Sequence, residues 1–299
     1  MSDRAPVFLV GAARSGTSLL YKMLCLHPEV AYISNWVRRY PRVPQLAVLN
    51  RLGRRLSATR QTVWFGRDSN AYVYGSARAL WRRLFPMPVE GEPVYGHHGI
   101  PQLESQAAGS PEQQRALAGT FAAVRRWGGG RRVVNKRIAN NRRIPLLAEI
   151  FPGARFVEIV RDGRAVAHSL SRVDWWDDDV VWWYGGTPRQ WREEGRDPWE
   201  ICARNWVEEL RELEAGLARV APERVLRVRY ETLVREPHAT LERIAEFMDL
   251  APDAGWRAQL ATLRFPDQNE RWRDQLDAAT VARIEDIQRE HLRRHGYLA

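Results

Sequence analysis

The sequence predicts an α/β protein: a single doubly wound domain over residues 1–299, with a central parallel sheet covered by helices. Three observations support this prediction. The clearest apolar runs, at 6–10 and 155–160, are short and continuous, as expected of strands buried on both faces. Segments with helical spacing of apolar residues separate such runs, which is the pattern of βαβ units. A chain of 299 residues, 44% of them hydrophobic, is long enough for one large domain with a full core.

The predicted elements alternate along the chain. The strand at 6–10 leads into a helix at 17–27, whereas residues 31–100 are rich in Arg, Tyr and Trp and give no clear assignment. Ser110 followed by Pro111 is typical of a helix start, with Ser as N-cap and Pro at the first helical position. This helix should run to about 127. Further strands are expected at 132–135, 155–160 and 224–230, and further helices at 142–150, 163–171, 199–220, 237–250 and 280–295.

Hydropathy, charge and cysteine content narrow the class of protein. No apolar run approaches about 20 residues, so we expect no transmembrane segment. The opening apolar stretch is too short for a signal peptide, and we expect a cytoplasmic protein. The net charge of +10 favours an anionic partner, but the arginines are scattered, which argues against nucleic acid. Cys25 and Cys202 form neither a disulfide framework nor a zinc-binding spacing, and we expect both to be buried in helices.

The stretch GAARSGTSLL, residues 11–20, has the frame of a phosphate-binding P-loop, G-x-x-x-x-G-K-[ST], but Thr17 stands in place of the lysine. A turn from strand to helix presents free backbone N–H groups and the positive end of the helix dipole. Gly16 allows a ligand to approach the backbone closely. The alternative is a tight turn whose hydroxyl residues are incidental. We expect this P-loop-like turn to hold a phosphate through Arg14, Ser15, Gly16, Thr17 and Ser18.

A second basic site is indicated at the end of the strand at 155–160. A nucleoside-triphosphate enzyme would need the missing lysine, and Mg²⁺ bound by an Asp at a strand end. Asp162 lies at such an end, but Arg161 and Arg164 flank it and disfavour a metal ion there. The two arginines suit a second anionic group instead. The sequence therefore suggests a nucleotide that is phosphorylated at two separate places.

GAARSGTSLL together with VRDGRAVAHSLSR, residues 160–172, resembles the sulfotransferases that use 3′-phosphoadenosine 5′-phosphosulfate (PAPS). In that family the first loop holds the 5′-phosphosulfate, and an Arg and a Ser with the spacing of Arg161 and Ser169 hold the 3′-phosphate. The pair Asn135-Lys136, RYETLVREP from Arg229 and NERWRDQL from Asn269 also resemble family features. The arginine in the loop is nearer the tyrosylprotein and carbohydrate branches than the small-phenol branch.

The resemblance implies transfer of a sulfuryl group from PAPS to a hydroxyl or amine, with release of adenosine 3′,5′-bisphosphate (PAP) and with no metal. Arg14 and Lys136 would act on the transferring group. Lys136 stands out because the chain has only two lysines among its 46 basic residues, and the other, Lys22, is expected to be solvated. Further cofactor contacts are implied for Tyr230, near the adenine, and for Arg271 and Trp272, which would close over the nucleotide. For Tyr230, simple packing at the strand end is an equal alternative.

The general base is the feature that departs from the resemblance. Alignment on the HPEV turn places Asn35 where the tyrosylprotein branch has a Glu, and an amide cannot accept the acceptor's proton. His97 and His98, in a loop flanked by Gly and Pro, are the best replacements, although such a pair can also be merely exposed. His168 is expected to be a packing residue.

The acceptor is not identified by the sequence. Seven tryptophans lie within residues 174–206, and those in the adjacent pairs Trp175-Trp176 and Trp182-Trp183 cannot both face inward from a helix. Some should line either a partner surface or an acceptor cleft, for a small molecule, glycan, lipid or peptide. Two other functions remain open: a P-loop nucleotide kinase or NTPase variant, and a non-catalytic nucleotide-binding protein. The oligomeric state is not indicated.

Overall fold

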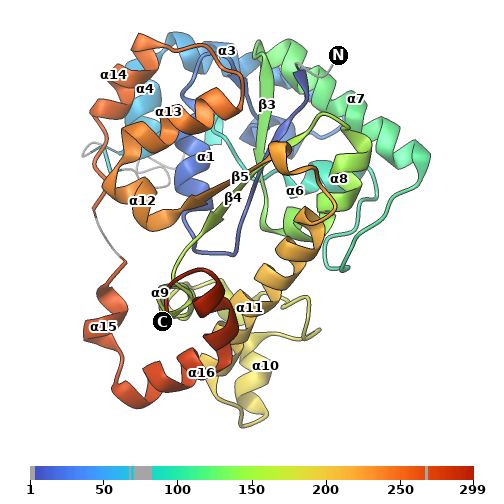
Figure 1. Cartoon of the computed structure of the whole chain (residues 1–299). Helices are drawn as coiled ribbons and strands as arrows, with labels where there is room; N and C mark the ends of the chain where they lie inside the picture. Colours follow the sequence, from blue (N-terminus) through green and yellow to red (C-terminus); the bar gives the residue numbers. More distant parts are fainter. Residues whose placement is uncertain (1–3, 67–68, 71–82, 267–268) are drawn as a thin grey trace.

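The computed structural model of the chain describes residues 4–66, 69–70, 83–266 and 269–299, and its centre is a five-stranded sheet. The strand order is β2-β3-β1-β4-β5, and all neighbouring pairs are parallel (Figure 1). The predicted α/β class with a parallel sheet is thus confirmed. The strands are β1 (Val7–Val10), β2 (Val30–Ala31), β3 (Arg132–Lys136), β4 (Arg155–Val160) and β5 (Val225–Arg229).

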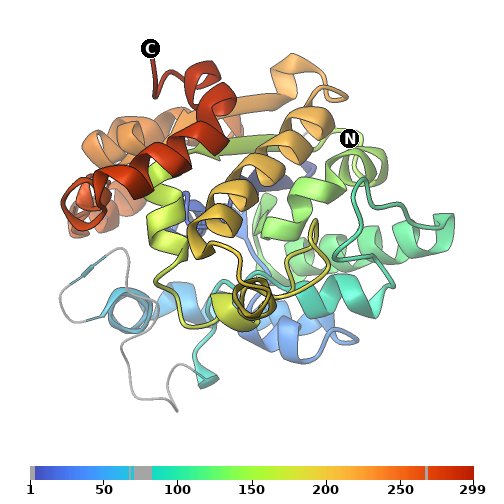
Figure 2. The same ribbon diagram turned by 90° about the horizontal axis from the view of Figure 1, so that it is seen from below.

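Helices cover both faces of the sheet (Figures 1 and 2), and the central strand β1 is therefore buried on both sides. Val7 and Leu9 belong to one apolar cluster, whereas Phe8 and Val10 belong to the other, as expected from the alternation of side chains along a strand. The first cluster involves α1 (Thr17–Cys25), α4 (Ser57–Phe65), α13 (Pro237–Phe247) and α14 (Ala254–Ala261). The second involves α7 (Pro111–Gly128), α8 (Ile144–Ile150) and α11 (Pro198–Leu217).

A third group of helices packs beyond the carboxyl ends of the strands, in the lower half of Figure 1. It is held by its own apolar cluster, centred on Leu170, Trp191 and Ile284. These helices close one end of the sheet, where parallel α/β proteins bind their ligands. They are α9 (Gly163–Leu170), α10 (Pro188–Glu193), α15 (Arg271–Gln275), α16 (Ala278–Arg294) and the lower part of α11.

The predicted elements with clear local signals are all found. The N-terminus of α7 has a capping box, in which Ser110 accepts from the backbone of Gln113 and the Gln113 side chain accepts from the backbone of Ser110. The predicted strand at 224–230 ends one residue early, because Tyr230 begins α12 (Tyr230–Arg235). The unassigned region holds several short elements: β2, α2 (Asn35–Arg39), η2 (Pro44–Val48), α3 (Leu49–Arg55), α4 and α6 (Glu92–His97). The remaining short turns of helix are η3 (Ile138–Arg143), η4 (Trp176–Asp178) and η5 (Pro222–Arg224).

Lys22 corrects a prediction, because it is not solvated. Its side chain is fully buried on α1, with Nζ 4.6 Å from the centroid of the Phe65 ring of α4. Burial lowers the pKa of Lys22 to about 7. The reason is tertiary packing: α4 packs against the face of α1 that carries Lys22, and nothing in the local sequence of α1 indicates this contact. Cys25 and Cys202 are both buried in helices, as predicted. Among the described helices, none is long and apolar enough to cross a membrane.

Candidate functional site

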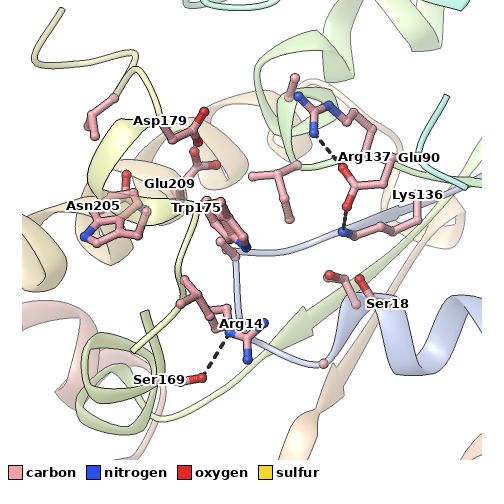
Figure 3. Close-up of a pocket in the computed structure, with 18 of the residues that line it drawn as sticks. Arg14, Ser18, Glu90, Lys136, Arg137, Ser169, Trp175, Asp179, Asn205 and Glu209 are labelled. Atoms are coloured by element: carbon pink, nitrogen blue, oxygen red, sulfur yellow. Dashed lines mark hydrogen bonds and ion pairs between the residues drawn. The ribbon is translucent and has the colours of Figure 1, made fainter. Parts of the chain in front are cut away.

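A cavity of about 950 Å³ lies at the carboxyl ends of the strands. Its walls come from the loop after β1, the ends of β3 and β4, the start of α12, and the segments around 90 and 173–182. Figure 3 shows side chains from these segments around one shared space. The topology places this cavity at the switch point of the sheet, since β3 and β4 lie on opposite sides of β1.

The loop between β1 and α1 is fixed by close backbone packing. Gly16 has a φ of 86°, and a Cβ placed there would lie 2.6 Å from Cδ2 of Tyr230. Asn141 of η3 clamps the start of the loop, because it accepts from Gly11 N (3.1 Å) and donates to Gly11 O (3.1 Å). Thr17 and Ser18 line the cavity together with Gly16, whereas Ser15 is buried beneath the loop and does not. The loop thus presents the start of α1 to the cavity.

Arg14 and Ser169 join the two predicted phosphate sites. Arg14 has a φ of 68°, which turns its side chain out of the loop, and its Nε donates to Ser169 Oγ at 3.0 Å (Figure 3). Arg161 lies behind them and donates to the carbonyl oxygen of Arg14 at 2.9 Å. Burial, and then the nearby charge of Arg161, lower the pKa of Arg14. Burial and the neighbouring charge make the charged form of Arg14 less favourable, and an anionic ligand beside Arg14 would offset that effect.

Arg161 is also held by aromatic and amide contacts. It is buried, with its guanidinium 4.3 Å from the ring centroid of Tyr230 and its Nε donating to Asn269 Oδ1 at 3.0 Å. Tyr230 and Arg271 line the cavity, as their predicted nucleotide contacts require. Trp272 does not: it is buried between the guanidinium groups of Arg164 and Arg273, each 4.6 Å from its ring centroid. Its predicted closure over the nucleotide therefore has no support in this arrangement.

Lys136 reaches the cavity from the end of β3. Its side chain is almost fully buried and forms an ion pair with Glu90, which also pairs with Arg137 at 2.6 Å (Figure 3). Burial by itself would raise the pKa of Glu90, but the charges of Lys136 and Arg137 outweigh it and lower that pKa to about 2. Asn135 faces the other way, where its Oδ1 accepts from the hydroxyl of Tyr95 at 2.7 Å. Of the predicted pair, Lys136 therefore lines the cavity, whereas Asn135 packs against Tyr95.

His97 and His98 are not brought to the cavity, which corrects their assignment as candidate bases. His97 is exposed at the end of α6, and a ring nitrogen of His98 lies 2.8 Å from Thr120 Oγ1 of α7. Burial, then the neighbouring His97, lower the pKa of His98. Asn35 is engaged by backbone groups, donating to Phe85 O at 3.0 Å and accepting from Met87 N at 3.1 Å. His168, expected to be a packing residue, is buried and yet also lines the cavity.

Carboxylates that sequence reasoning missed stand at the other end of the cavity. Burial raises the pKa of Asp179, although the charge of Arg137 partly offsets it. Burial also raises the pKa of Glu209, which accepts from Arg142 (3.0 Å), Trp182 (2.9 Å) and Asn141 (2.5 Å). Glu209 therefore connects Asn141, which holds the loop after β1, to Trp182. The run of Asp177, Asp178 and Asp179 was visible in the sequence, but no local pattern separates the member that faces the cavity from the other two.

Some of the seven tryptophans within residues 174–206 line the cavity, and others are buried in the core. Trp175, Trp176 and Trp182 line the cavity, and Trp175 is half exposed. Trp191 and Trp206 are fully buried. Residues 182–183 lie in a turn rather than a helix, so Trp182 turns to Glu209 while Trp183 donates to Asn205 at 3.2 Å. The prediction that some of these rings line a cleft is consistent with this placement.

Asp162, the candidate magnesium ligand of the alternative function, is already engaged. Its carboxylate accepts from the backbone N–H of Arg164 (2.9 Å) and caps α9. It also forms an ion pair with the Arg164 guanidinium at 2.8 Å. Both side chains are buried, and neither lines the cavity.

Comparison with known proteins identifies relatives. The model of the sulfotransferase family matches residues 6–254. Protein-tyrosine sulfotransferase A of Caenorhabditis elegans is 25% identical over 250 residues, which cover 83% of this chain and 50% of that protein. The omega-hydroxy-beta-dihydromenaquinone-9 sulfotransferase Stf3 of Mycobacterium bovis is 24% identical over 262 residues, covering 82% of this chain and 63% of that protein. The chain thus spans only half to five-eighths of the length of these curated relatives.

Solved structures share the fold. Sulfotransferase STF9 from Mycobacterium avium has a TM-score of 0.55 at 17% identity, covering 98% of this chain and 77% of that one. Sulfotransferase STF1 from Mycobacterium tuberculosis has a TM-score of 0.52, also at 17% identity, covering 95% of this chain and 76% of that one. At this level of identity the likeness establishes the common fold.

Proposed function

This chain belongs to the sulfotransferase family, and on that premise we propose that it transfers a sulfuryl group from PAPS to a hydroxyl or amine acceptor and releases PAP. One observation carries the proposal. The loop after β1 and the pair Arg161 and Ser169 face a single cavity, and Lys136 reaches the same cavity from β3. Two groups of anion-binding residues that line one cavity suit a nucleotide with phosphates at two positions.

The phosphate end of the cavity would hold the nucleotide. The N-terminus of α1, with Gly16, Thr17 and Ser18, offers backbone and hydroxyl donors to the 5′-phosphosulfate. Arg161 and Ser169 would take the 3′-phosphate, with charge-assisted hydrogen bonds. Arg14 reaches both regions, since its backbone belongs to the loop and its guanidinium contacts Ser169. Tyr230, packed on Arg161, forms the wall nearest the adenine in this assignment.

Lys136 would stabilise the charge that develops during transfer. As the bond between sulfur and the bridging oxygen breaks, negative charge grows on that oxygen and on the sulfuryl oxygens. The Lys136 ammonium is already desolvated by burial, so it would lose little further hydration on meeting that charge. Its ion pair with Glu90 holds the ammonium at the wall of the cavity. Arg137 keeps Glu90 compensated if Lys136 turns toward the cofactor.

We assign the general base to Asp179 in place of His97 and His98. A base must lie on the acceptor side and have a pKa not far below the working pH. Asp179 lines the cavity, and its pKa is raised. Glu90 also lines the cavity, but a pKa of about 2 makes it a weak base. Asp179 would accept the acceptor's proton as the acceptor oxygen or nitrogen attacks sulfur.

The acceptor end of the cavity suits a largely apolar or aromatic molecule that carries a hydroxyl. Trp175, Trp182, Leu103 and Val180 line it beside Asp179. A polypeptide tyrosine and a hydroxylated lipid, the acceptors named for two relatives, both meet this description. Glycans and other small molecules remain alternative acceptors. A cytoplasmic location and a single-domain organisation stay predictions.

Calorimetric binding of PAP tests the proposal, with ATP as the control ligand and with and without Mg²⁺. We expect PAP to bind more tightly than ATP and to do so without metal. Preference for ATP with Mg²⁺ would instead support the kinase or NTPase alternative, which the Asp162–Arg164 pair disfavours. PAP binding without sulfuryl transfer to any acceptor, in a screen of phenols, peptides and hydroxylated lipids with PAPS, would support a non-catalytic nucleotide-binding protein.

A further inference from the structure

Glu214, His291 and His295 form a cluster outside the cavity. Glu214 lies on α11, His291 lies on α16, and His295 follows the last residue of α16. The two histidines are four residues apart, so they share one face of the helix. One ligand atom of each residue lies within 4.8 Å of the other two. None of the three residues lines the cavity, so the sulfotransferase site leaves this cluster without a role.

The distances within the cluster fit a metal better than direct hydrogen bonds. Glu214 Oε1 lies 3.4 Å from His291 Nδ1 and 3.4 Å from His295 Nε2. A hydrogen bond between an imidazolium and a carboxylate would bring N and O to about 2.7–2.9 Å. Two ligands of a tetrahedral zinc, each about 2.0–2.1 Å from the metal, lie roughly 3.3–3.4 Å apart. The observed separation is therefore that of two ligands sharing one ion.

The three ligand atoms are also left unsatisfied. Glu214 Oε1, His291 Nδ1 and His295 Nε2 are buried, and none makes a hydrogen bond of regular geometry within the described residues, although the carboxylate lies within ion-pair distance of both rings. The His291 side chain is only 4% exposed. Buried polar atoms without partners are rare in native proteins, and a bound ion is one of the recognised explanations.

Neighbouring residues orient the cluster. Arg294 forms an ion pair with Oε2 of Glu214, which leaves Oε1 directed at the two histidines. The ring of His291 packs edge-on against Trp206, with centroids 6.2 Å apart, which fixes the imidazole. Partners that hold a ligand's second atom or its ring are a regular feature of protein metal sites.

We propose that Glu214, His291 and His295 bind a zinc ion that braces α16 against α11. Two histidines and one glutamate are ligands that zinc accepts, and a water molecule would complete a tetrahedral centre. The brace would act on a helix that supports the nucleotide site from behind. Gln288 of α16 donates to Gly163 O at 3.1 Å, two residues beyond Arg161. Both histidines lie past residue 254, where the family match ends.

Zinc titration of the full chain, carrying no added histidine tag and stripped with a chelator, tests this proposal. We expect one zinc ion per chain by calorimetry and by metal analysis after dialysis. His295→Gln should weaken zinc binding by more than about 100-fold, beyond the usual cost of losing an outer partner of a metal site. His238→Gln, an exposed histidine on α13, should bind zinc as the parent does. His295→Cys should retain zinc, because a thiolate is also a zinc ligand.

The outcomes separate a zinc site from a simple ion-pair cluster. If the histidines serve only as cations for Glu214, the stripped parent takes up no stoichiometric zinc, and the proposal fails. The same holds if His238→Gln loses as much affinity as His295→Gln. Circular dichroism of each stripped variant checks that it is folded, and the titration of the parent decides the question even if a variant is not. PAP binding without zinc is a separate measurement, so either proposal can fail alone.

Discussion

Arg14 Nε donates to Ser169 Oγ at 3.0 Å, across 155 residues of sequence. The contact joins the loop after β1 to the helix after β4, and both motifs of the resemblance meet in it. Because the two strands are neighbours in the sheet, their carboxyl ends deliver both residues to one edge. The sequence suggested both residues separately, but their direct contact follows only from the strand order.

Ser169→Ala should weaken PAP binding by about 10- to 100-fold, because a hydrogen bond to a charged group contributes about 1.5–3 kcal/mol. The substitution removes both a donor to the phosphate and the acceptor that orients Arg14. Ser171→Ala is the matched control, since the Ser171 hydroxyl donates to His168 O and lies outside the cavity. Calorimetry with PAP compares the two variants. Equal losses in both would mean that Ser169 has no specific part in binding.

Lys136→Ala should lower kcat by about 10²–10³ and change PAP affinity much less, because its contact matters most in the transition state. Lys136→Arg should not restore the rate, since the guanidinium fork does not fit where a compact ammonium stands. Steady-state kinetics with PAPS and calorimetry with PAP measure the two quantities. An unchanged kcat in Lys136→Ala would refute the assigned role.

Asp179→Asn should lower kcat by about 10²–10⁴, the usual contribution of a general base. In the parent enzyme the rate should fall as pH drops toward the pKa of Asp179, which lies above its ordinary value, because only the carboxylate accepts a proton. Asp178→Asn is the control, since Asp178 pairs with Arg189 at 2.7 Å and lies outside the cavity. A pH–rate profile retained by Asp179→Asn would place the base elsewhere, with Glu209→Gln the next variant, because Glu209 also lines the cavity and has a raised pKa.

Lys22→Met should stabilise the protein near pH 7 and remove a pH dependence of its stability. The folded-state pKa of Lys22 is lowered to about 7 from 10.5, so between these values the unfolded chain binds more protons. Stability therefore rises with pH across that window, and the destabilising effect is fully present below it. Each unit of the shift corresponds to about 1.4 kcal/mol, so the gain can reach a few kcal/mol. Urea unfolding of both proteins at pH 7 and pH 9.5 checks it: a constant difference would contradict the assignment.

Local chemistry made most of the regular elements predictable. The short apolar runs, the capping box at Ser110 and the glycines of the phosphate loop carry their signals within a few residues. The family follows from two such motifs and is confirmed by the match over 6–254. Residues 31–100 gave no clear assignment from the sequence, because the helices in the described part of this range are short and β2 has only two residues. Single-domain organisation and the individual site roles stay predictions.

The fold class, the glycine-containing loop after β1 and the motif that follows β4 could be recognised from the sequence, because they depend on spacing within short segments. Which distant side chains share the cavity depends instead on the packing of the whole chain. That packing leaves His97 and His98 outside the cavity and places Glu90 and Asp179 in its wall. It also buries Lys22 and sets Glu214 against His291 and His295 at the end of α16. Loop paths and helix packing set these positions, and both depend on contacts between segments that no local pattern records.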